Sequence, residues 1–442
     1  MTSGKWVERD MAVVWHGFTQ MSCYADNEPI IVERGEGCEL VGVDGRRYLD
    51  AISSLWVTTL GHCVPELDQA VRDQLSRVAH STLLGHGNRV VIELAEALAR
   101  IVPVDRPHFL FASDGAAAVE QALKIAFQYW VNRGVPGRTS FLALDGAYHG
   151  DTVGSLSLGA GGFGTDIFDP LRFEVVRAPD VSAAVGLLGA HADRLAAVVV
   201  EPLVQGAAGM LLTPAEDVAR LAAACREAGL LLICDEVATG FGRTGWLFAS
   251  QACGIRPDLL CLGKGLTGGY LPMSATAAAA PVYEAFLGPD LSGATFYHGH
   301  SYGGNALAAA VALRHLQLLA EWDVLANVSA RSAQLGALLA ERVAPLPAVG
   351  DVRLCGLMGG VELAPPGPGV RGAPANVGLR WGRRVCAAAV RRGVLLRPLG
   401  DVVVLMPMLT STAGEIERIV DVLVAAIEEV TAGATGFSTG ST

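Results

Sequence analysis

Short apolar runs alternate with helix-like patterns along the middle of the 442-residue chain. Five of these runs predict buried strands, at Phe109–Ser113, Phe141–Asp145, Ala196–Pro202, Leu230–Glu236 and Met273–Ala279. Between them, residues 116–131 and 214–229 place apolar side chains at helical spacing. This alternation predicts an α/β fold with a mainly parallel sheet that helices cover on both faces.

The two ends of the chain have a different pattern. Residues 29–51 predict antiparallel strands joined by a turn at Asp44-Gly45, and residues 393–407 predict a hairpin-like pair of strands after long helices. We therefore expect a smaller α+β domain that both termini build from residues 1–65 and 319–430, around a large domain of residues 66–318. Residues 363–378 are rich in proline and glycine and predict a surface loop, and residues 431–442 predict a disordered tail.

The amino-acid composition argues against several classes of protein. The net charge of −11 argues against a nucleic-acid or anionic-membrane partner. The nine cysteines include no CxxC pair, which is typical of reduced thiols in a cytosolic protein. The N-terminus lacks the apolar core of a signal peptide, and no apolar run is long enough to span a bilayer. We expect a cytoplasmic enzyme.

Lysine is rare in this chain, and one of its lysines stands in an unusual place. Only Lys5, Lys124 and Lys264 occur among 33 basic residues, and Lys264 lies between two glycines after an apolar run. An ordinary turn lysine in solvent is one interpretation. A phosphate-binding P-loop is another, but Asp258 and Gly265 stand where that motif needs glycine and serine or threonine. The third is a reactive amine, because lysine can form a Schiff base and arginine cannot.

A reactive lysine that binds pyridoxal 5'-phosphate (PLP) needs an acid against the ring nitrogen and a seat for the phosphate. Asp235 ends an apolar run, although an ordinary helix N-cap is an equally good interpretation of that residue alone. Gly115 and Ala116 fall at a predicted helix start, where free N–H groups accept an anion. Tyr148 could stack on the cofactor ring through its aromatic face, or it could be an ordinary core residue. Arg397 could bind a carboxylate through two hydrogen bonds, or it could be an ordinary surface arginine.

The segment "FYHGHSYGGN" (296–305) contains two histidines that could suggest a metal site. His298 and His300 lack a third ligand at a suitable spacing, so we expect no metal.

Taken together, these motifs resemble those of the class III, PLP-dependent aminotransferases of fold type I. The resemblance runs from about Trp15 to about Ile427. It is most specific in "CDEVATGFGRTG", in "LGKGLTGGYLP" with 29 residues from acid to amine, and in "HGHSYGGN". It implies that Lys264 binds PLP covalently and later moves a proton, and that Asp235 pairs with the pyridine nitrogen. It also implies that Gly115 and Ala116 bind the phosphate, and that Tyr148 lies by the ring as a further catalytic residue.

Within that family, "WHGFTQM", "SSLWVTTLGH", "YHGDTVGSLS" and "EPLVQGAAGM" are most similar to the branch that converts 8-amino-7-oxononanoate to 7,8-diaminononanoate in biotin biosynthesis. This likeness implies that Arg397 binds the substrate carboxylate, and that Phe18 and Trp56 line an apolar substrate channel. It further implies a homodimer, in which Gly299, His300 and Ser301 reach the cofactor phosphate of the neighbouring subunit.

The same likeness leaves the amino donor open between S-adenosylmethionine and lysine. Phe18 and Val404 stand where the branch that uses S-adenosylmethionine has a tyrosine, and Leu55 stands where it has a tryptophan. The likeness implies that Leu55 is also a substrate-binding residue. Several motifs, among them "AHSTLLG" and "HGHSY", look more like the branch that uses lysine. Another class III aminotransferase, acting on an ω-amino acid or a diamine, is the main alternative, and a PLP-dependent aminomutase is a further one.

Overall fold

The structure, a computed structural model, describes residues 3–159, 164–364 and 379–432. The chain forms two compact units. The large unit is Pro65–Val328, and the small unit combines Met1–Val64 with Ser329–Thr442.

A seven-stranded sheet forms the centre of the large unit, in the order β4-β12-β11-β10-β7-β5-β6. Its strands are β4 (His108–Ala112), β5 (Ser140–Leu144), β6 (Val175–Ala178), β7 (Leu195–Val200), β10 (Leu231–Asp235), β11 (Leu259–Leu262) and β12 (Ser274–Ala278). Strands β6, β5, β7, β10 and β11 are parallel, whereas β12 runs antiparallel to both of its neighbours. The prediction of a mainly parallel sheet is confirmed.

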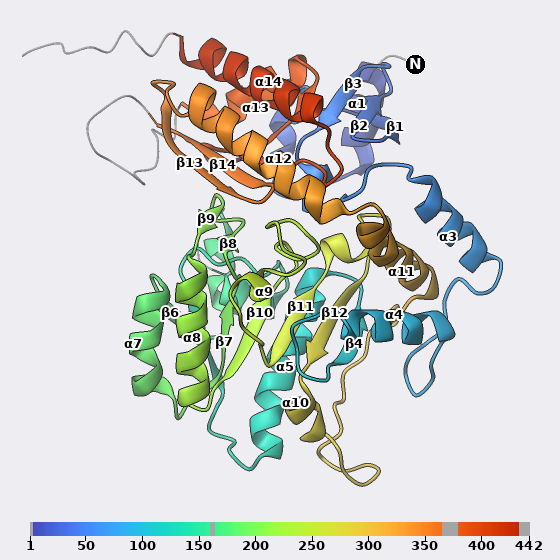
Figure 1. Ribbon diagram of the computed structural model, residues 1–442, viewed down its shortest axis with the longest axis vertical. Coiled ribbons are helices and arrows are strands. Elements are labelled where there is room, and N and C mark those ends of the chain that lie inside the picture. Colours follow the sequence, from blue (N-terminus) through green and yellow to red (C-terminus); the bar gives the residue numbers. More distant parts are fainter. Residues whose placement is uncertain (1–2, 160–163, 365–378, 433–442) are drawn as a thin grey trace, which may run out of the picture. The chain divides into compact units, whose positions relative to one another are not determined.

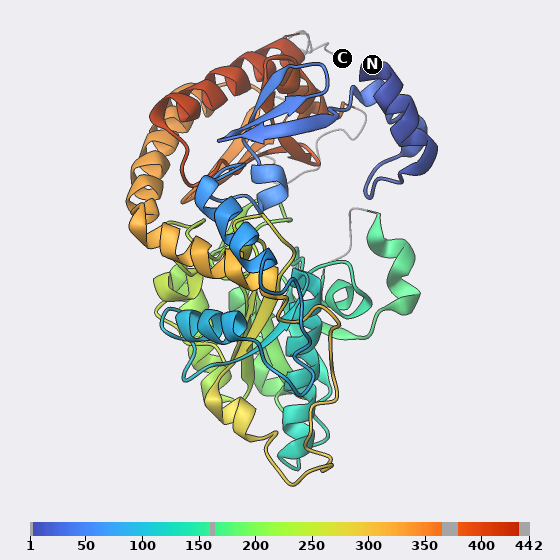
Figure 2. The same ribbon diagram turned by 90° about the vertical axis from the view of Figure 1, so that its right-hand side faces the viewer.

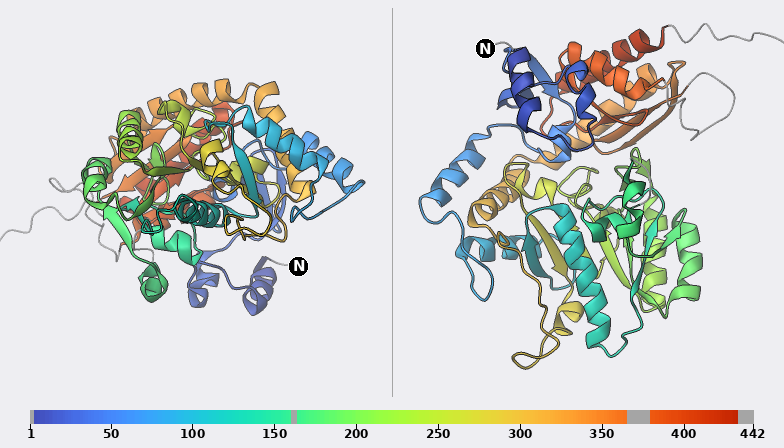
Figure 3. Two further views of the ribbon diagram at one scale, coloured as in Figure 1. Left: turned by 90° about the horizontal axis from the view of Figure 1, so that it is seen from below. Right: turned by 180° about the vertical axis from the view of Figure 1, so that it is seen from behind.

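Helices cover both faces of this sheet. Helix α5 (Gly115–Asn132) packs on one face, where Ala122 and Ala126 meet Val199 and Ile233 in one apolar core. Helices α7 (Val181–His191) and α8 (Ala215–Glu227) pack against each other and the sheet. Figure 1 shows α8 in front of the sheet, and the view from behind in Figure 3 shows α5 on the opposite side. The small alanines of α5 allow this close approach to the strands.

The remaining elements of the large unit surround the sheet. They are α3 (Pro65–Leu75), α4 (Arg89–Ala99), α6 (Val153–Leu158), η3 (Thr165–Leu171), β8 (Val204–Gln205), β9 (Leu211–Leu212), α9 (Ala249–Ala252), η4 (Lys264–Thr267), α10 (Ala280–Glu284) and α11 (Ala306–Glu321). The boundary between the units falls inside α12 (Val324–Leu338).

The small unit contains two four-stranded sheets, in the orders β1-β2-β3-β15 and β13-β14-β17-β16. Its elements are α1 (Ser3–Val13), η1 (Met21–Cys23), η2 (Ala25–Asn27), β1 (Val32–Glu36), β2 (Glu39–Gly42), β3 (Arg47–Asp50), α2 (Ser53–Trp56), η5 (Leu339–Val343), β13 (Val349–Cys355), β14 (Met358–Leu363), α13 (Trp381–Arg391), β15 (Val394–Leu395), β16 (Arg397–Leu399), β17 (Val402–Leu405) and α14 (Ala413–Thr431). Arg418 of α14 donates a 2.8 Å hydrogen bond to Glu39 of β2. Figure 2 shows that segments from both ends of the chain build this unit.

The predicted antiparallel strands around Asp44-Gly45 are confirmed as β2 and β3. The predicted hairpin-like pair at 393–407 differs in detail, because three short strands form there. Strand β15 joins the first sheet, parallel to β3, whereas β16 and β17 form a hairpin in the second. The chain changes sheet at Leu396, whose side chain is buried, and Pro398 is tolerated because β16 lies at a sheet edge.

Two predictions lie largely outside the described residues. They are the surface loop at 363–378, of which only Leu363 and Ala364 are described, and the disordered tail, of which only Thr431 and Ala432 are described. Thr431 belongs to α14. Among the helices that the structure describes, none is both long and apolar enough to cross a bilayer.

Candidate active site

Lys264 and Asp235 lie at the carboxyl ends of two adjacent parallel strands. Asp235 is the last residue of β10 and stands opposite Cys261 of β11, three residues before Lys264. Ligand sites of open α/β sheets form at this edge. The register therefore brings the two residues together, as their electrostatic interaction also shows. Asp235 is not the N-cap of an assigned helix, so that alternative interpretation is not supported.

The Lys264 amine lies in a low-dielectric environment. Burial lowers its pKa, and the negative charges of Asp235 and Glu201 offset this only in part. A lowered pKa leaves more of the amine neutral and able to act as a nucleophile or a base. The Lys264 backbone has a φ of 41°, a left-handed conformation that is strained for a residue with a side chain.

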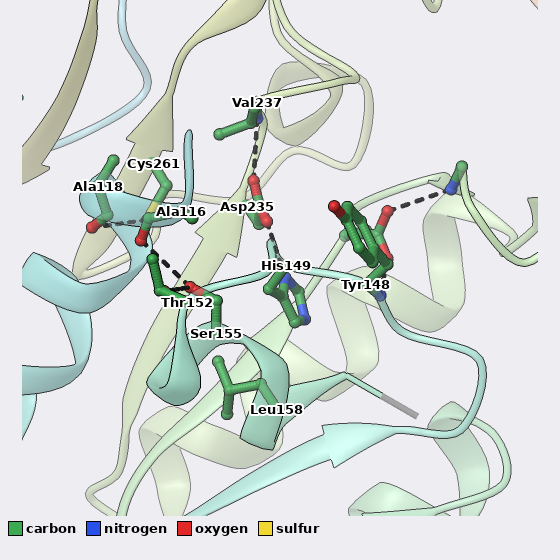
Figure 4. A network of polar contacts seen from close by, with 12 residues as sticks. Ala116, Ala118, Tyr148, His149, Thr152, Ser155, Leu158, Asp235, Val237 and Cys261 are labelled. Carbon is green, nitrogen blue, oxygen red and sulfur yellow. Dashed lines mark hydrogen bonds and ion pairs between the residues drawn. The ribbon is translucent and has the colours of Figure 1, made fainter. Parts of the chain in front are cut away.

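Asp235 is held by two hydrogen bonds (Figure 4). Its Oδ2 atom accepts from Nδ1 of His149 at 2.7 Å, and its Oδ1 atom accepts from the backbone N–H of Val237 at 3.0 Å. Burial disfavours the protonated form of His149, but the hydrogen bond and charge of Asp235 outweigh burial and raise the pKa of His149. Nε2 of His149 is buried and has no partner among the described residues. The pair fixes the orientation of a buried carboxylate.

Tyr148 precedes His149 and is held by both its backbone and its side chain. Its hydroxyl donates to Asp151 at 2.9 Å, and its N–H donates to the carboxylate of Glu201 at 3.2 Å. Figure 4 shows Tyr148 and His149 side by side in the segment between β5 and α6. The half-buried ring of Tyr148 therefore lies close to the fixed carboxylate of Asp235.

The N-terminus of α5 offers an anion seat on the same sheet edge. The Asp114 side chain caps α5 by accepting from the N–H of Ala117 at 2.9 Å, but the N–H groups of Gly115 and Ala116 have no acceptor among the described residues. A side chain at position 115 would bring its Cβ within 2.6 Å of Val237 Cγ1, so only glycine fits there. Free N–H groups and the helix dipole favour a phosphate at this point.

The segment 299–301 follows a long loop that leads to α11. Nε2 of His300 lies 3.0 Å from the Ser113 hydroxyl, and Nδ1 accepts from the N–H of Tyr302 at 3.1 Å. His300 therefore contacts the start of α5 within its own chain. His298 instead pairs with Lys124 at 3.0 Å. No group of three or more His, Cys, Asp or Glu side chains in the described part of the chain is arranged to hold a metal ion.

Four of the predicted substrate-binding residues belong to the small unit. Phe18 is exposed in the segment after α1, and Trp56 is buried at the end of α2. Arg397 begins β16 opposite Val404 of β17. No ion pair or hydrogen bond to Arg397 is found among the described residues, so its half-buried guanidinium is available for a carboxylate.

Leu55, the fourth of these residues, lies in a left-handed turn. Ser53, Ser54, Leu55 and Trp56 all have positive φ values, from 48° to 78°. The buried Asp50 stabilises the turn by accepting hydrogen bonds from the N–H and the hydroxyl of Ser54, at 3.0 and 2.7 Å. The turn leaves Leu55 exposed.

Sequence reasoning did not assign a role to three residues of this site. His149 stands inside the quoted "YHGDTVGSLS" motif, Glu201 lies inside the predicted strand run Ala196–Pro202, and Val237 lies inside the quoted "CDEVATGFGRTG" motif. All three lie near Asp235, and the order of the strands brings the buried His149 and Glu201 to that position.

Comparisons with known proteins agree with this geometry. Residues 21–427 match the family model described as aminotransferase class-III. The chain is 45% identical, over 96% of its length and 81% of the relative's, to the adenosylmethionine-8-amino-7-oxononanoate aminotransferase of Nitratidesulfovibrio vulgaris.

Solved structures show the same likeness. The crystal structure of adenosylmethionine-8-amino-7-oxononanoate aminotransferase from Methanocaldococcus jannaschii matches with a TM-score of 0.91 at 37% identity, covering 97% of this chain and 99% of that one. An (S)-enantioselective omega-transaminase from Thermomicrobium roseum matches with a TM-score of 0.90 at 33% identity, covering 97% and 99%. The expected fold is thereby confirmed, and the chain belongs to the class III aminotransferases.

Proposed function

We propose that the large unit holds PLP at the sheet edge described above. The N–H groups of Gly115 and Ala116 offer a seat for the phosphate, and Asp235 offers a buried carboxylate to the ring nitrogen. Lys264 provides the only lysine amine at this edge among the described residues. When bound, PLP acts as an electron sink for the substrate carbon that loses a proton.

The residues of this chain then have distinct roles. Lys264 anchors the cofactor and, once released, moves a proton at the reacting carbon, because its lowered pKa allows the neutral amine to act as a base. Asp235 keeps the ring nitrogen protonated, and His149 holds Asp235 in place. Tyr148 would lie by the ring and contact cofactor and substrate, because it directly precedes His149, which holds Asp235.

We propose that the amino acceptor is 8-amino-7-oxononanoate, which becomes 7,8-diaminononanoate in biotin biosynthesis. The observation that carries this proposal is the name shared by relatives that match over nearly the whole chain. Arg397 supports it, because a half-buried guanidinium with no ion-pair partner among the described residues suits the far carboxylate of this substrate. The exposed Phe18 supplies apolar surface for its alkyl chain, whereas the buried Trp56 offers little.

The amino donor is S-adenosylmethionine or lysine. The names of the relatives favour the first, whereas Leu55 and Val404 lack the aromatic rings expected for it and Phe18 lacks the hydroxyl of the expected tyrosine. Val404 is fully buried in β17, so a larger ring at that position requires a differently packed small unit.

We also propose a cytoplasmic homodimer, in which Gly299, His300 and Ser301 approach the cofactor phosphate of the partner subunit. The exposed apolar side chains around this segment support the proposal. Leu291, Tyr297 and Tyr302 are 83%, 70% and 63% exposed, and such surface is typical of a covered interface.

Another class III activity is the alternative, and the match to the Thermomicrobium omega-transaminase favours it.

The test is a donor panel with purified protein and PLP. S-adenosylmethionine and lysine are each supplied with 8-amino-7-oxononanoate, and 7,8-diaminononanoate is measured by mass spectrometry. Product with one donor supports the proposal. If neither donor yields product while an ω-amino acid or a diamine is consumed with a simple keto acceptor, the alternative holds. Conversion of a single amino-keto substrate to its isomer of equal mass, without any added donor, points to an aminomutase.

Lys264→Ala separates a PLP enzyme from a protein of any other chemistry. We expect this variant to lose the visible absorption of covalently bound cofactor and to lose turnover by about 10²–10⁴-fold. Lys264→Arg keeps the charge but not the nucleophile, so full turnover in that variant contradicts the assignment.

A further inference from the structure

Glu201 is a buried carboxyl group that the proposed roles leave unused. It directly follows β7, and Val200 of β7 stands opposite Cys234 of β10. The register therefore places Glu201 level with Asp235, at the same edge of the sheet. Its side chain is 6% exposed.

The two oxygens of Glu201 hold two different loops. Oε2 accepts from the N–H of Tyr148 at 3.2 Å, and Oε1 accepts from the N–H of Gly206 at 3.1 Å. Gln205 joins the same two loops by donating to the carbonyl of Asp145 at 3.1 Å. Tyr148 immediately precedes His149, which holds Asp235. A continuous set of contacts thus leads from Glu201 to the catalytic carboxylate.

The charge of Glu201 also acts on this site. Burial raises the pKa of Glu201 to about 7; the charge of His149 opposes this rise, and that of Asp235 adds to it. The negative form in turn raises the pKa values of His149 and Lys264. Arg177 and Arg243 are the other charged groups that act on this cluster, Arg177 on His149 and Arg243 on Lys264.

A neutral side chain could not make the same contacts. Glutamine has one acceptor oxygen, so its amide NH₂ would face the N–H group of one of the two loops. An unsatisfied buried donor costs about 1–3 kcal/mol, which is a reason for a carboxylate here despite its desolvation. The arrangement needs two acceptors and one negative charge.

We propose that Glu201 is a positioning residue of the transamination site, which fixes the Tyr148–His149 backbone so that His149 keeps Asp235 aligned with the cofactor. This inference rests on the proposed binding of PLP. In this proposal Glu201 does not contact the cofactor itself, and it acts on the cofactor only through His149 and Asp235. A purely structural role for Glu201 is the competing explanation.

Glu236 offers a matched control for that competing explanation. It is also a fully buried glutamate at the end of β10, and burial raises its pKa. It accepts from the N–H groups of Ala249 and Ser250 at 2.5 and 2.8 Å, and these contacts do not involve Tyr148 or His149. Glu201→Gln and Glu236→Gln therefore remove the same chemical group from comparable surroundings.

The first measurement is the affinity of each full-length apoprotein for PLP, alongside its melting temperature. We expect both variants to lose stability, but only Glu201→Gln to weaken PLP binding, by about 10-fold or more. Its kcat should fall while KM for the carboxylate substrate stays within about twofold. Equal PLP affinity in wild type and Glu201→Gln, or equal loss in both variants, overturns the proposal.

The second measurement is the pKa of Lys264 in the apoprotein. Because the chain has only three lysines, labelling of Lys264 by an amine reagent is readily resolved by mass spectrometry as a function of pH. Removal of the Glu201 charge should lower the Lys264 pKa, and Glu236→Gln should leave it unchanged. An unchanged Lys264 pKa in Glu201→Gln contradicts the inference.

Glu201→Asp keeps the proposal testable if the glutamine variant does not fold. It retains the charge but is too short to reach both N–H groups, so we expect an intermediate PLP affinity and a Lys264 pKa near that of wild type. Wild-type PLP affinity in this variant contradicts the positioning role. Failure of the proposed function is recognised separately, because wild-type protein would then show no PLP binding.

Discussion

The carboxylate of Asp235 accepts a 2.7 Å hydrogen bond from Nδ1 of His149, which lies 86 residues earlier in the chain. Strand β7 lies between the strands that lead to these two residues, so the bond crosses the end of a neighbouring strand. It makes Nδ1 a donor and leaves the carboxylate with one fixed orientation. A fixed buried carboxylate suits a cationic ring nitrogen better than a mobile one, because it needs no reorganisation during the reaction.

Removal of the His149 donor should weaken cofactor binding. A hydrogen bond to a charged group contributes about 1.5–3 kcal/mol, so we expect His149→Leu to raise the Kd for PLP by about 10–150-fold and to lower the melting temperature. His149→Asn keeps an N–H at nearly the same place and should retain most of the affinity. Titration of each apoprotein with PLP measures both effects. Equal Kd values for the two variants speak against the role of the hydrogen bond.

Loss of the Arg397 guanidinium should affect substrate binding and leave cofactor binding intact. Arg397→Met removes a charge-assisted contact, and we expect KM for 8-amino-7-oxononanoate to rise by about 10–100-fold with an unchanged Kd for PLP. Arg391→Met is the control, because Arg391 forms an exposed ion pair with Glu429. Steady-state kinetics with the preferred donor measure the change. An unchanged KM in Arg397→Met removes this residue from the substrate site.

Strands β4, β5, β7, β10 and β12 could be predicted because apolar runs are typical of strands buried on both faces. Strand β6 was not predicted, since it lies at the sheet edge and carries the half-buried Arg177. The reversed direction of β12 was also hidden, because its all-buried sequence looks like that of its parallel neighbours. Direction and order depend on contacts between distant segments, which local patterns do not contain.

In the candidate site, too, some residues could be predicted from local sequence, whereas others depend on contacts between distant segments. Lys264 stood out through composition, and Asp235 through its place after an apolar run. His149 and Glu201 have no comparable local signal, because their importance comes from lying beside Asp235 once β5, β7 and β10 are assembled. Nothing in the sequence indicated the left-handed turn at 53–56, because its residues include no glycine.

The left-handed turn should store measurable strain. A left-handed conformation costs a residue with a side chain about 1–2 kcal/mol, and Leu55 has a φ of 78°. Leu55→Gly and Leu55→Ala remove the same exposed apolar surface, but only glycine relieves the strain. We expect the glycine variant to have a free energy of unfolding about 1 kcal/mol higher than the alanine variant. Chemical denaturation of both variants tests this, and equal stability indicates an unstrained turn.

Glu201 should make the stability of the apoprotein fall as pH rises toward neutrality. Its folded-state pKa of about 7 lies above the ordinary value of 4.5, so the folded state binds more protons than the unfolded state between these pH values. The free energy of unfolding therefore decreases across this window, by up to about 3 kcal/mol, and the decrease is complete above pH 7. In Glu201→Gln the group that titrates is gone, so the fall between pH 5 and pH 8 should be smaller by this contribution. Urea denaturation of wild type and variant at several pH values gives the two curves. If the curves run parallel, the carboxyl group of Glu201 does not titrate in this window, and its charge is already fixed at pH 5.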